Sequence, residues 1–98
     1  MPTYSVYLVR CRDGSVYTGI ATDVARRLTE HDQGPRGAKF LRGKGPLTLI
    51  YEQEIGDRSL ASKIESRVKR LPKMDKENNA ILSARIRDFI GQCQAAAE

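Results

Sequence analysis

The stretch YSVYLVRCRDGSVYTGIA, residues 4–21, decides the fold of this chain. Its first half is rich in aromatic and β-branched residues, and apolar side chains occur at both odd and even positions, which is typical of a strand covered on both faces. Asp13-Gly14 then marks a tight turn, and residues 15–21 resume the character of a strand. The stretch therefore predicts a β-hairpin whose first strand lies inside the sheet.

The length of the hairpin loop determines which side chains share a face, since side chains alternate along a strand and cross-strand partners point the same way. A two-residue loop would put Tyr7 and Tyr17 on opposite faces. A three-residue loop, residues 12–14, instead pairs Tyr7 with Gly19 and puts both tyrosines on one face. That loop ends in a residue at positive φ, which Gly14 adopts without strain. The sequence therefore favours the three-residue loop.

The next segment predicts a helix, a loop and a third strand. Residues 23–33 have a helical apolar stripe, for which Thr22 is the expected N-cap, and the helix ends at Gly34-Pro35. Residues 47–55 have strand character, and their polar alternation predicts an edge strand that faces solvent.

Two helices complete the predicted ββαβαα order, an α+β fold with a three-stranded antiparallel sheet. Asp57 is the expected cap of a helix that Pro72 breaks. The last helix is expected from about Asp75 and frays in the tail Ala95 to Ala97. Its expected core-facing residues are Ile81, Leu82, Ile86, Phe89 and Ile90.

Length and charge bound the class of protein. Ninety-eight residues suffice for one domain, expected over 1–98 with its core at about 4–90. A formal charge of +5 favours polyanionic partners such as nucleic acid. Cys11 and Cys93 fit no metal-binding or disulfide framework, and no stretch is long and apolar enough to cross a bilayer. We therefore expect a cytoplasmic protein that does not enter membranes.

Residues 34–46, GPRGAKFLRGKGP, predict a basic, glycine-rich loop. The glycine spacing does not match a Walker A loop, and Gly45 stands where that motif has Ser or Thr. A basic loop of this kind is either a solvated surface loop or a set of phosphate contacts. The candidate phosphate-binding cations are Arg36, Lys39, Arg42 and Lys44.

Two helices carry charged residues beside their apolar stripes. Arg27 and His31 follow the spacing that also contains Val24 and Leu28, so both border the buried side of the first helix. Glu65 borders the stripe of the second helix in the same way. An ion pair with Lys69 four residues on is its simplest structural interpretation.

Together these residues resemble the GIY-YIG nuclease superfamily. The features are a tyrosine late in the first strand, Tyr-x-Gly in the second, and Arg and His one turn apart. The short bacterial members that consist of this domain alone are the most similar in layout. They share the Gly-Ala-Lys and Arg-Gly-Lys-Gly segments found here at 37–39 and 42–45. The residues that carry the resemblance are Tyr7, Tyr17, Gly19, Arg27, His31, Ala61, Glu65 and Lys69.

The resemblance implies a divalent-metal-dependent endonuclease. Glu65 would be the only protein ligand of one magnesium or manganese ion, and Arg27 would stabilise charge on the phosphate. Tyr7, Tyr17 or His31 would activate the attacking water. DNA is favoured over RNA as the substrate, recognised through phosphates and shape, with Lys69 among the contacts.

The sequence also departs from the family pattern. Ser5 and Val6 replace the Gly and Ile of the first motif, Thr18 replaces the Ile of the second, and Ile20 stands where some active members carry a lysine that assists the base. Two rival interpretations follow. The chain is either a non-catalytic module that binds DNA or RNA, or a subunit of a repair complex that needs a partner protein.

Overall fold

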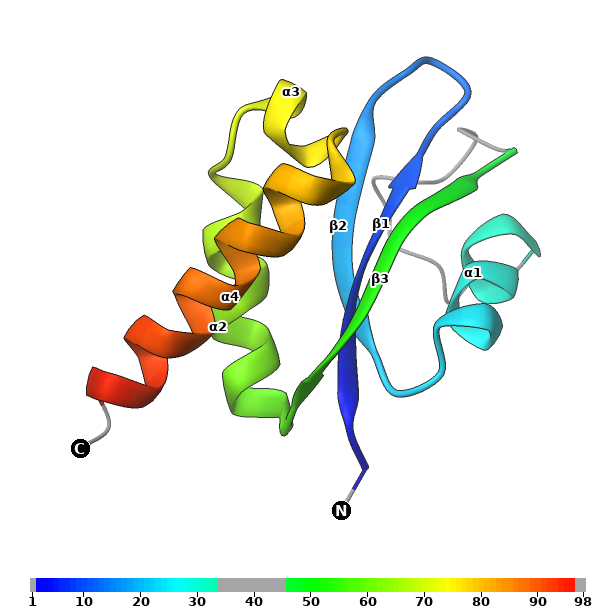
Figure 1. Cartoon of the computed structure of the whole chain (residues 1–98). Coiled ribbons are helices and arrows are strands. Elements are labelled where there is room, and N and C mark those ends of the chain that lie inside the picture. The colour runs from blue at the N-terminus through cyan, green and yellow to red at the C-terminus, as the bar shows by residue number, and fades with distance from the viewer. Residues whose placement is uncertain (1, 34–45, 97–98) are drawn as a thin grey trace.

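The computed structural model describes residues 2–33 and 46–96. Three antiparallel strands form one sheet in the order β2-β1-β3, so β1 is the central strand and β3 an edge, as predicted. The fold is α+β (Figure 1). The elements in chain order are β1 Tyr4–Arg10, β2 Val16–Ala21, α1 Val24–Gln33, β3 Thr48–Gly56, α2 Arg58–Lys69, α3 Lys73–Lys76 and α4 Asn79–Ala96.

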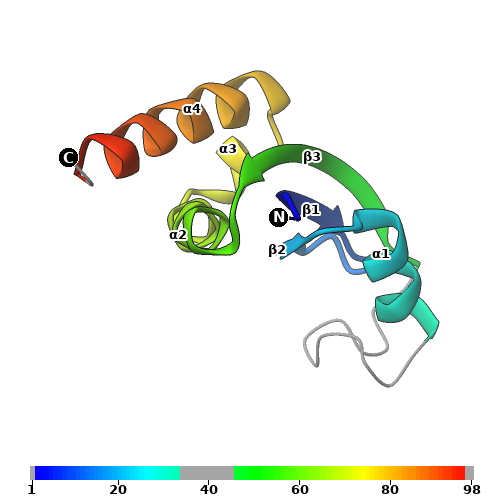
Figure 2. The ribbon, with the colours of Figure 1, turned by 90° about the horizontal axis from the view of Figure 1, so that it is seen from below.

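Helices cover both faces of the sheet. Figure 2 shows α2 and α4 on one side of the strands and α1 on the other. Alternation along β1 divides the core accordingly, because Val6 and Leu8 pack in a cluster with residues of α2 and α4, whereas Tyr7 and Val9 pack in a second cluster with Val24 of α1. These four side chains of β1 are all buried, which confirms the prediction of a strand covered on both faces.

The hairpin has the predicted three-residue loop. Val9 pairs with Tyr17 and Tyr7 with Gly19. Gly14 has a φ of 88°, and the Asp13 side chain accepts a hydrogen bond from the backbone N–H of Ser15 at 3.0 Å. Both tyrosines therefore face α1, and the register that the sequence favoured is confirmed.

The N-cap of α1 is Asp23, which corrects the assignment of this role to Thr22. The Asp23 carboxylate accepts a hydrogen bond from the backbone N–H of Arg26 at 3.1 Å. Thr22 lies one residue too early, since a capping side chain accepts from the second or third residue after it. Asp57 caps α2 as predicted, by accepting from the N–H of Leu60 at 2.9 Å.

The single last helix expected from Asp75 was wrong, because two helices occupy this segment. Pro72 precedes the short α3, and Asn78 then starts α4 by accepting from the N–H of Ile81 at 3.1 Å. Asparagine between two helices is itself an N-cap signal, and here it begins the second helix. The element order is thus ββαβααα, and α4 remains helical through Ala96 in the tail where fraying was expected.

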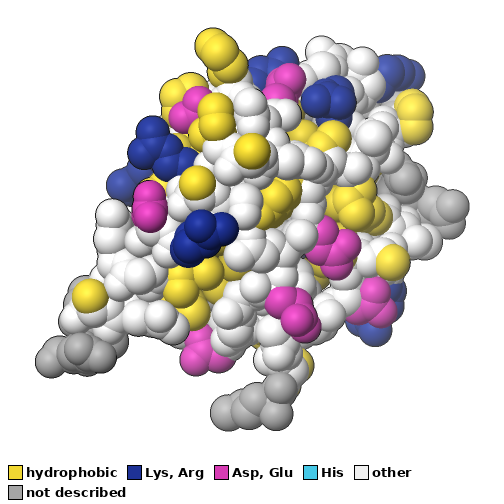
Figure 3. Space-filling view, in the orientation of Figure 1, with side chains coloured by type: hydrophobic (Ala, Val, Ile, Leu, Met, Phe, Trp, Pro, Cys, Tyr) yellow, Lys and Arg dark blue, Asp and Glu magenta, His cyan; other side chains and the backbone are white. Residues whose placement is uncertain are grey.

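Most of the expected core of α4 is correct. Leu82 and Ile86 are fully buried, and Phe89 and Ile90 pack partly buried against the same cluster. Ile81 was wrongly placed inward, since it is 41% exposed in the first turn of α4. Figure 3 shows hydrophobic side chains among charged ones on this outer face. None of the helices within the described residues has the length and apolar character needed to cross a membrane.

Candidate active site

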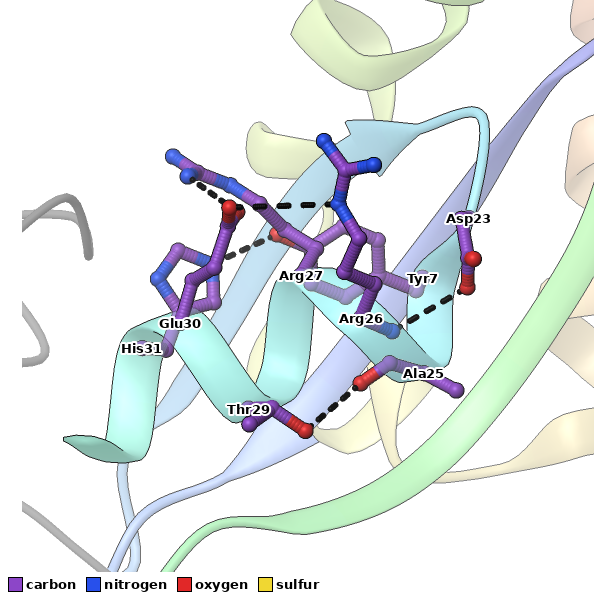
Figure 4. A network of polar contacts seen from close by, with 8 residues as sticks. All are labelled: Tyr7, Asp23, Ala25, Arg26, Arg27, Thr29, Glu30 and His31. Atoms are coloured by element: carbon purple, nitrogen blue, oxygen red, sulfur yellow. Dashed lines mark hydrogen bonds and ion pairs between the residues drawn. The ribbon is translucent and has the colours of Figure 1, made fainter. Parts of the chain in front are cut away.

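Three aromatic side chains meet where the hairpin faces α1. The Tyr7 hydroxyl and His31 Nε2 form a buried hydrogen bond of 2.8 Å (Figure 4). The Tyr17 ring lies 6.4 Å from that of Tyr7 and 5.8 Å from that of His31, measured between centroids. Tyr7 is 1% exposed and His31 is 6% exposed, whereas Tyr17 is half-buried. The hairpin register and the helical spacing thus bring three predicted site residues together.

Gly19 provides the space that the Tyr7 ring occupies. A Cβ atom built on Gly19 would lie 2.5 Å from the Tyr7 hydroxyl oxygen and 2.6 Å from Cζ. These distances are far below van der Waals contact, so any larger residue would displace the phenol. The glycine is therefore required by the position of the tyrosine opposite it.

Arg27 lies one helical turn before His31 and projects to the same side of α1 (Figure 4). Its Nη1 donates to Glu30 Oε1 at 3.1 Å, and Arg26 Nε lies 4.0 Å from the same carboxylate. Glu30 was not among the predicted site residues, although an Arg-Glu pair at i, i+3 could have identified it. Glu30 holds the guanidinium in place while leaving it one-third exposed.

Glu65 comes from α2, which contacts β2 and β1. Its side chain is 22% exposed, and Lys69 Nζ lies 3.8 Å from Oε2, so the expected i, i+4 ion pair is present. Glu65 is nevertheless close enough to the tyrosines to raise the pKa values of both electrostatically. The carboxylate therefore lies near the aromatic cluster.

The electrostatics of the cluster favour protonated phenols. Burial raises the pKa of Tyr7 to about 12, the neighbouring Tyr17 adds to this rise, and Arg27 opposes it. Burial is also the main cause of the raised pKa of Tyr17, with Glu65 second and Arg27 opposing. Arg27 thus lowers the pKa of both tyrosines, as expected, but burial raises it by more, because removing a phenolate from water is unfavourable. Neither tyrosine is a phenolate at neutral pH.

Only one candidate nucleic-acid contact falls within the described residues. Lys69 is exposed and lies beside Glu65, on the side of α2 that leads to the cluster. The four loop cations, Arg36, Lys39, Arg42 and Lys44, lie outside the described residues.

The donor set fits one hard divalent cation. Within residues 2–33 and 46–96 no group of three or more His, Cys, Asp or Glu side chains could hold a metal ion. A single carboxylate, Glu65, suits magnesium or manganese, since magnesium keeps several waters and takes one or two carboxylates together with substrate phosphate oxygens.

The chain is similar to several known proteins. A family model described as the GIY-YIG catalytic domain matches residues 3–78. A UPF0213 protein of Yersinia pestis is 54% identical over 83 residues, covering 85% of this chain and 86% of the relative. The solution NMR structure of an Enterococcus faecalis protein is 37% identical, has a TM-score of 0.55, and covers 79% of this chain and 81% of that one. A second NMR structure, of a UPF0213 protein from Bacillus halodurans, is 40% identical with a TM-score of 0.47 and covers 76% of this chain and 79% of that one.

Proposed function

Because this chain belongs to the GIY-YIG nuclease family, we propose that it is a divalent-metal-dependent endonuclease that hydrolyses phosphodiester bonds in DNA. The observation that carries the proposal is the buried hydrogen bond between the Tyr7 hydroxyl and His31 Nε2, in a cluster bordered by Arg27 and Glu65. Selection by DNA structure rather than sequence, and a cytoplasmic location, are part of the proposal. The buried free thiols of Cys11 and Cys93 suit a reducing compartment.

Tyr7 and His31 would activate the attacking water together. A phenol with a pKa of about 12 is a poor base by itself, but its hydroxyl can accept a proton from water while it passes its own proton to His31 Nε2. His31 must be neutral and unprotonated at Nε2 to accept that proton. We therefore propose Tyr7 as the residue beside the water and His31 as the proton acceptor, two of the three candidates that the sequence left open.

Arg27 and Glu65 would act on the phosphate. The one-third-exposed guanidinium of Arg27 offers further donors to the charge that develops on the phosphoryl oxygens. Glu65 would hold the divalent cation, whose contribution when bound is Lewis-acid polarisation of the scissile phosphate. Lys69 would be drawn from its pair with Glu65 toward the phosphates of the substrate.

Cleavage assays on defined substrates test this function. Purified protein is incubated with end-labelled duplex, flapped, branched and single-stranded DNA and the matching RNA, with magnesium, manganese or a chelator. We expect metal-dependent cleavage of DNA that Glu65→Gln removes. The matched control is Glu54→Gln on the exposed surface of β3, which should cleave as the wild type does.

Binding to DNA without cleavage in either metal would contradict the proposal and favour the non-catalytic module. Cleavage that appears only after a copurifying protein is added would identify the subunit of a repair complex.

A further inference from the structure

A cationic groove lies between α2 and α4, on the face of the sheet opposite to α1. Its volume is about 620 Å³, within the range of ligand pockets in general. α2 and its C-cap supply most of the wall and α4 supplies an aromatic ring. The lining residues are Lys63, Ser66, Arg67, Arg70, Leu71 and Phe89.

The groove combines positive charge with an apolar floor. Three of its lining residues are cations, and none of the described residues that line it is acidic. The Arg67 guanidinium lies 5.9 Å from the centroid of the Phe89 ring and donates to Gln92 Oε1 at 2.7 Å, so it is held in place by two partners. Cations beside an aromatic ring are the combination by which proteins bind single-stranded nucleic acid.

Helical geometry separates this groove from the candidate active site. Arg67 follows Glu65 by two residues, so the two side chains project roughly 200° apart around the axis of α2. Glu65 approaches the tyrosines, whereas Arg67 reaches Phe89 on α4. The two sites thus lie on opposite sides of one helix, whose diameter with side chains is about 10–12 Å.

A band of exposed residues, three of the four basic, joins the two sites around the exposed side of α2. Going round the axis from Glu65, Lys69 lies at roughly 40°, Ser66 at roughly 100°, Arg70 at roughly 140° and Lys63 at roughly 160°. All four are exposed, and Glu65 is the only acidic residue of α2. Basic side chains in dark blue are visible along the α2 and α4 side of the molecule in Figure 3.

We propose that this band and groove bind a single-stranded extension of the DNA whose scissile phosphate lies at the candidate active site. The occupant is a single strand because the band turns around one helix, and duplex DNA, with a persistence length of about 50 nm, is too stiff to follow it. One base would stack on the Arg67 guanidinium, which lies over the Phe89 ring, while neighbouring phosphates meet Lys63 and Arg70. The inference rests on the proposed nuclease function and names its substrate class as duplex DNA with a single-stranded tail.

Binding by matched charge variants tests the groove. All proteins carry Glu65→Gln, so that no cleavage occurs during the measurement. The groove variant is Lys63→Gln/Arg70→Gln, and the control is Lys73→Gln/Arg87→Gln, which removes the same charges from exposed positions outside the groove. Affinity for a blunt duplex and for the same duplex with a tail is measured against salt concentration.

The groove variant should lower the salt slope for the tailed duplex by about 1.4, because each single-strand phosphate contact contributes about 0.7. The salt slope of the groove variant for the blunt duplex should stay at the wild-type value. The control should keep the wild-type slopes for both duplexes. Phe89→Leu, which keeps an apolar side chain against the core, should weaken binding of the tailed duplex about fivefold or more.

Equal slopes for the groove variant and the control would overturn the inference, and so would an equal loss for the tailed and the blunt duplex. Because binding is measured without turnover, failure of the wild type to cleave would remove the nuclease proposal and leave this result standing.

Discussion

At the scale of single residues, the hydroxyl of Tyr7 is the atom on which the proposed chemistry depends. Replacing Tyr7 by Phe removes that hydroxyl and keeps the ring that packs against Val9 and Val24. We expect the rate of cleavage to fall by at least about 100-fold, as for other lost general acid-base groups. Tyr17→Phe, the matched control, should lose less, because Tyr17 is half-buried and the Tyr7–His31 hydrogen bond remains. Single-turnover rates measure both, and an equal loss for the two variants would contradict the role given to Tyr7.

The raised pKa of Tyr7 predicts a pH dependence of stability. Its pKa is about 12 in the folded protein, above the ordinary tyrosine value of 10.0. The buried neutral phenol therefore stabilises the folded state fully below pH 10, and this contribution is lost as the pH rises from 10 toward 12. The free energy of unfolding should fall over this window, and less steeply in Tyr7→Phe. Urea unfolding at a series of pH values measures the difference, and parallel curves for the two proteins would show that Tyr7 is not the group responsible.

Thr18 carries a buried polar atom. In the sequence this residue is notable only because it replaces the Ile of the second family motif. Its hydroxyl has no hydrogen-bond partner among the described residues, and the residue is 3% exposed. An unpaired buried hydroxyl costs roughly 1–3 kcal/mol. Thr18→Val should therefore raise the free energy of unfolding by about 1 kcal/mol, whereas Thr48→Val on exposed β3 should change it by less than about 0.5 kcal/mol. Chemical denaturation measures both changes in the free energy of unfolding. A lower value for Thr18→Val than for the wild type would mean that the hydroxyl has a partner.

At the scale of elements, the hairpin was predictable because one local signal fixed its register. Gly14 selects the loop, and alternation then places every side chain of β1 and β2. Helix ends were less predictable, because Asp23 competes with Thr22 and Asn78 lies inside a segment whose apolar spacing continues through it. The ion pair between Arg27 and Glu30 was not predicted, since sequence spacing alone does not show that it lies beside the candidate site.

The pairing of Gly19 with Tyr7 makes the hairpin sensitive to one methyl group. Gly19→Ala should displace the Tyr7 ring from His31 and lower the cleavage rate more than it lowers the melting temperature. The control is Gly91→Ala on α4, where an added Cβ meets nothing within 4 Å. A helical Gly→Ala change of this kind should stabilise by about 0.5–1 kcal/mol and leave cleavage unchanged. Cleavage assays and thermal melts on both variants measure this, and full activity in Gly19→Ala would refute the steric argument.

At the scale of the whole molecule, the net charge of +5 includes two sets of cations that we propose as separate contacts for DNA. The basic loop follows α1, which carries Arg27 and His31, whereas the groove lies beyond α2. The loop stays a prediction from the sequence, in which its four cations lie within nine residues of the chain. The groove could not be predicted from the sequence. Its cations have the spacing of an ordinary solvated helix surface, and its aromatic ring comes from a different helix.

The two surfaces should therefore respond to different substrates. Arg42→Gln/Lys44→Gln in the loop removes one arginine and one lysine, as do the groove variant and its control. If the loop contacts the duplex, the loop variant should lower the salt slope for the blunt duplex by about 1.8, since each duplex phosphate contributes about 0.9. The groove variant should leave that slope unchanged, because it acts only on the tail. Salt titrations of blunt and tailed duplexes with both variants measure this. If the loop variant kept the wild-type slope on the blunt duplex, another basic surface would have to hold the duplex. The loop cations would then be solvated residues that make the protein more basic without contacting the substrate.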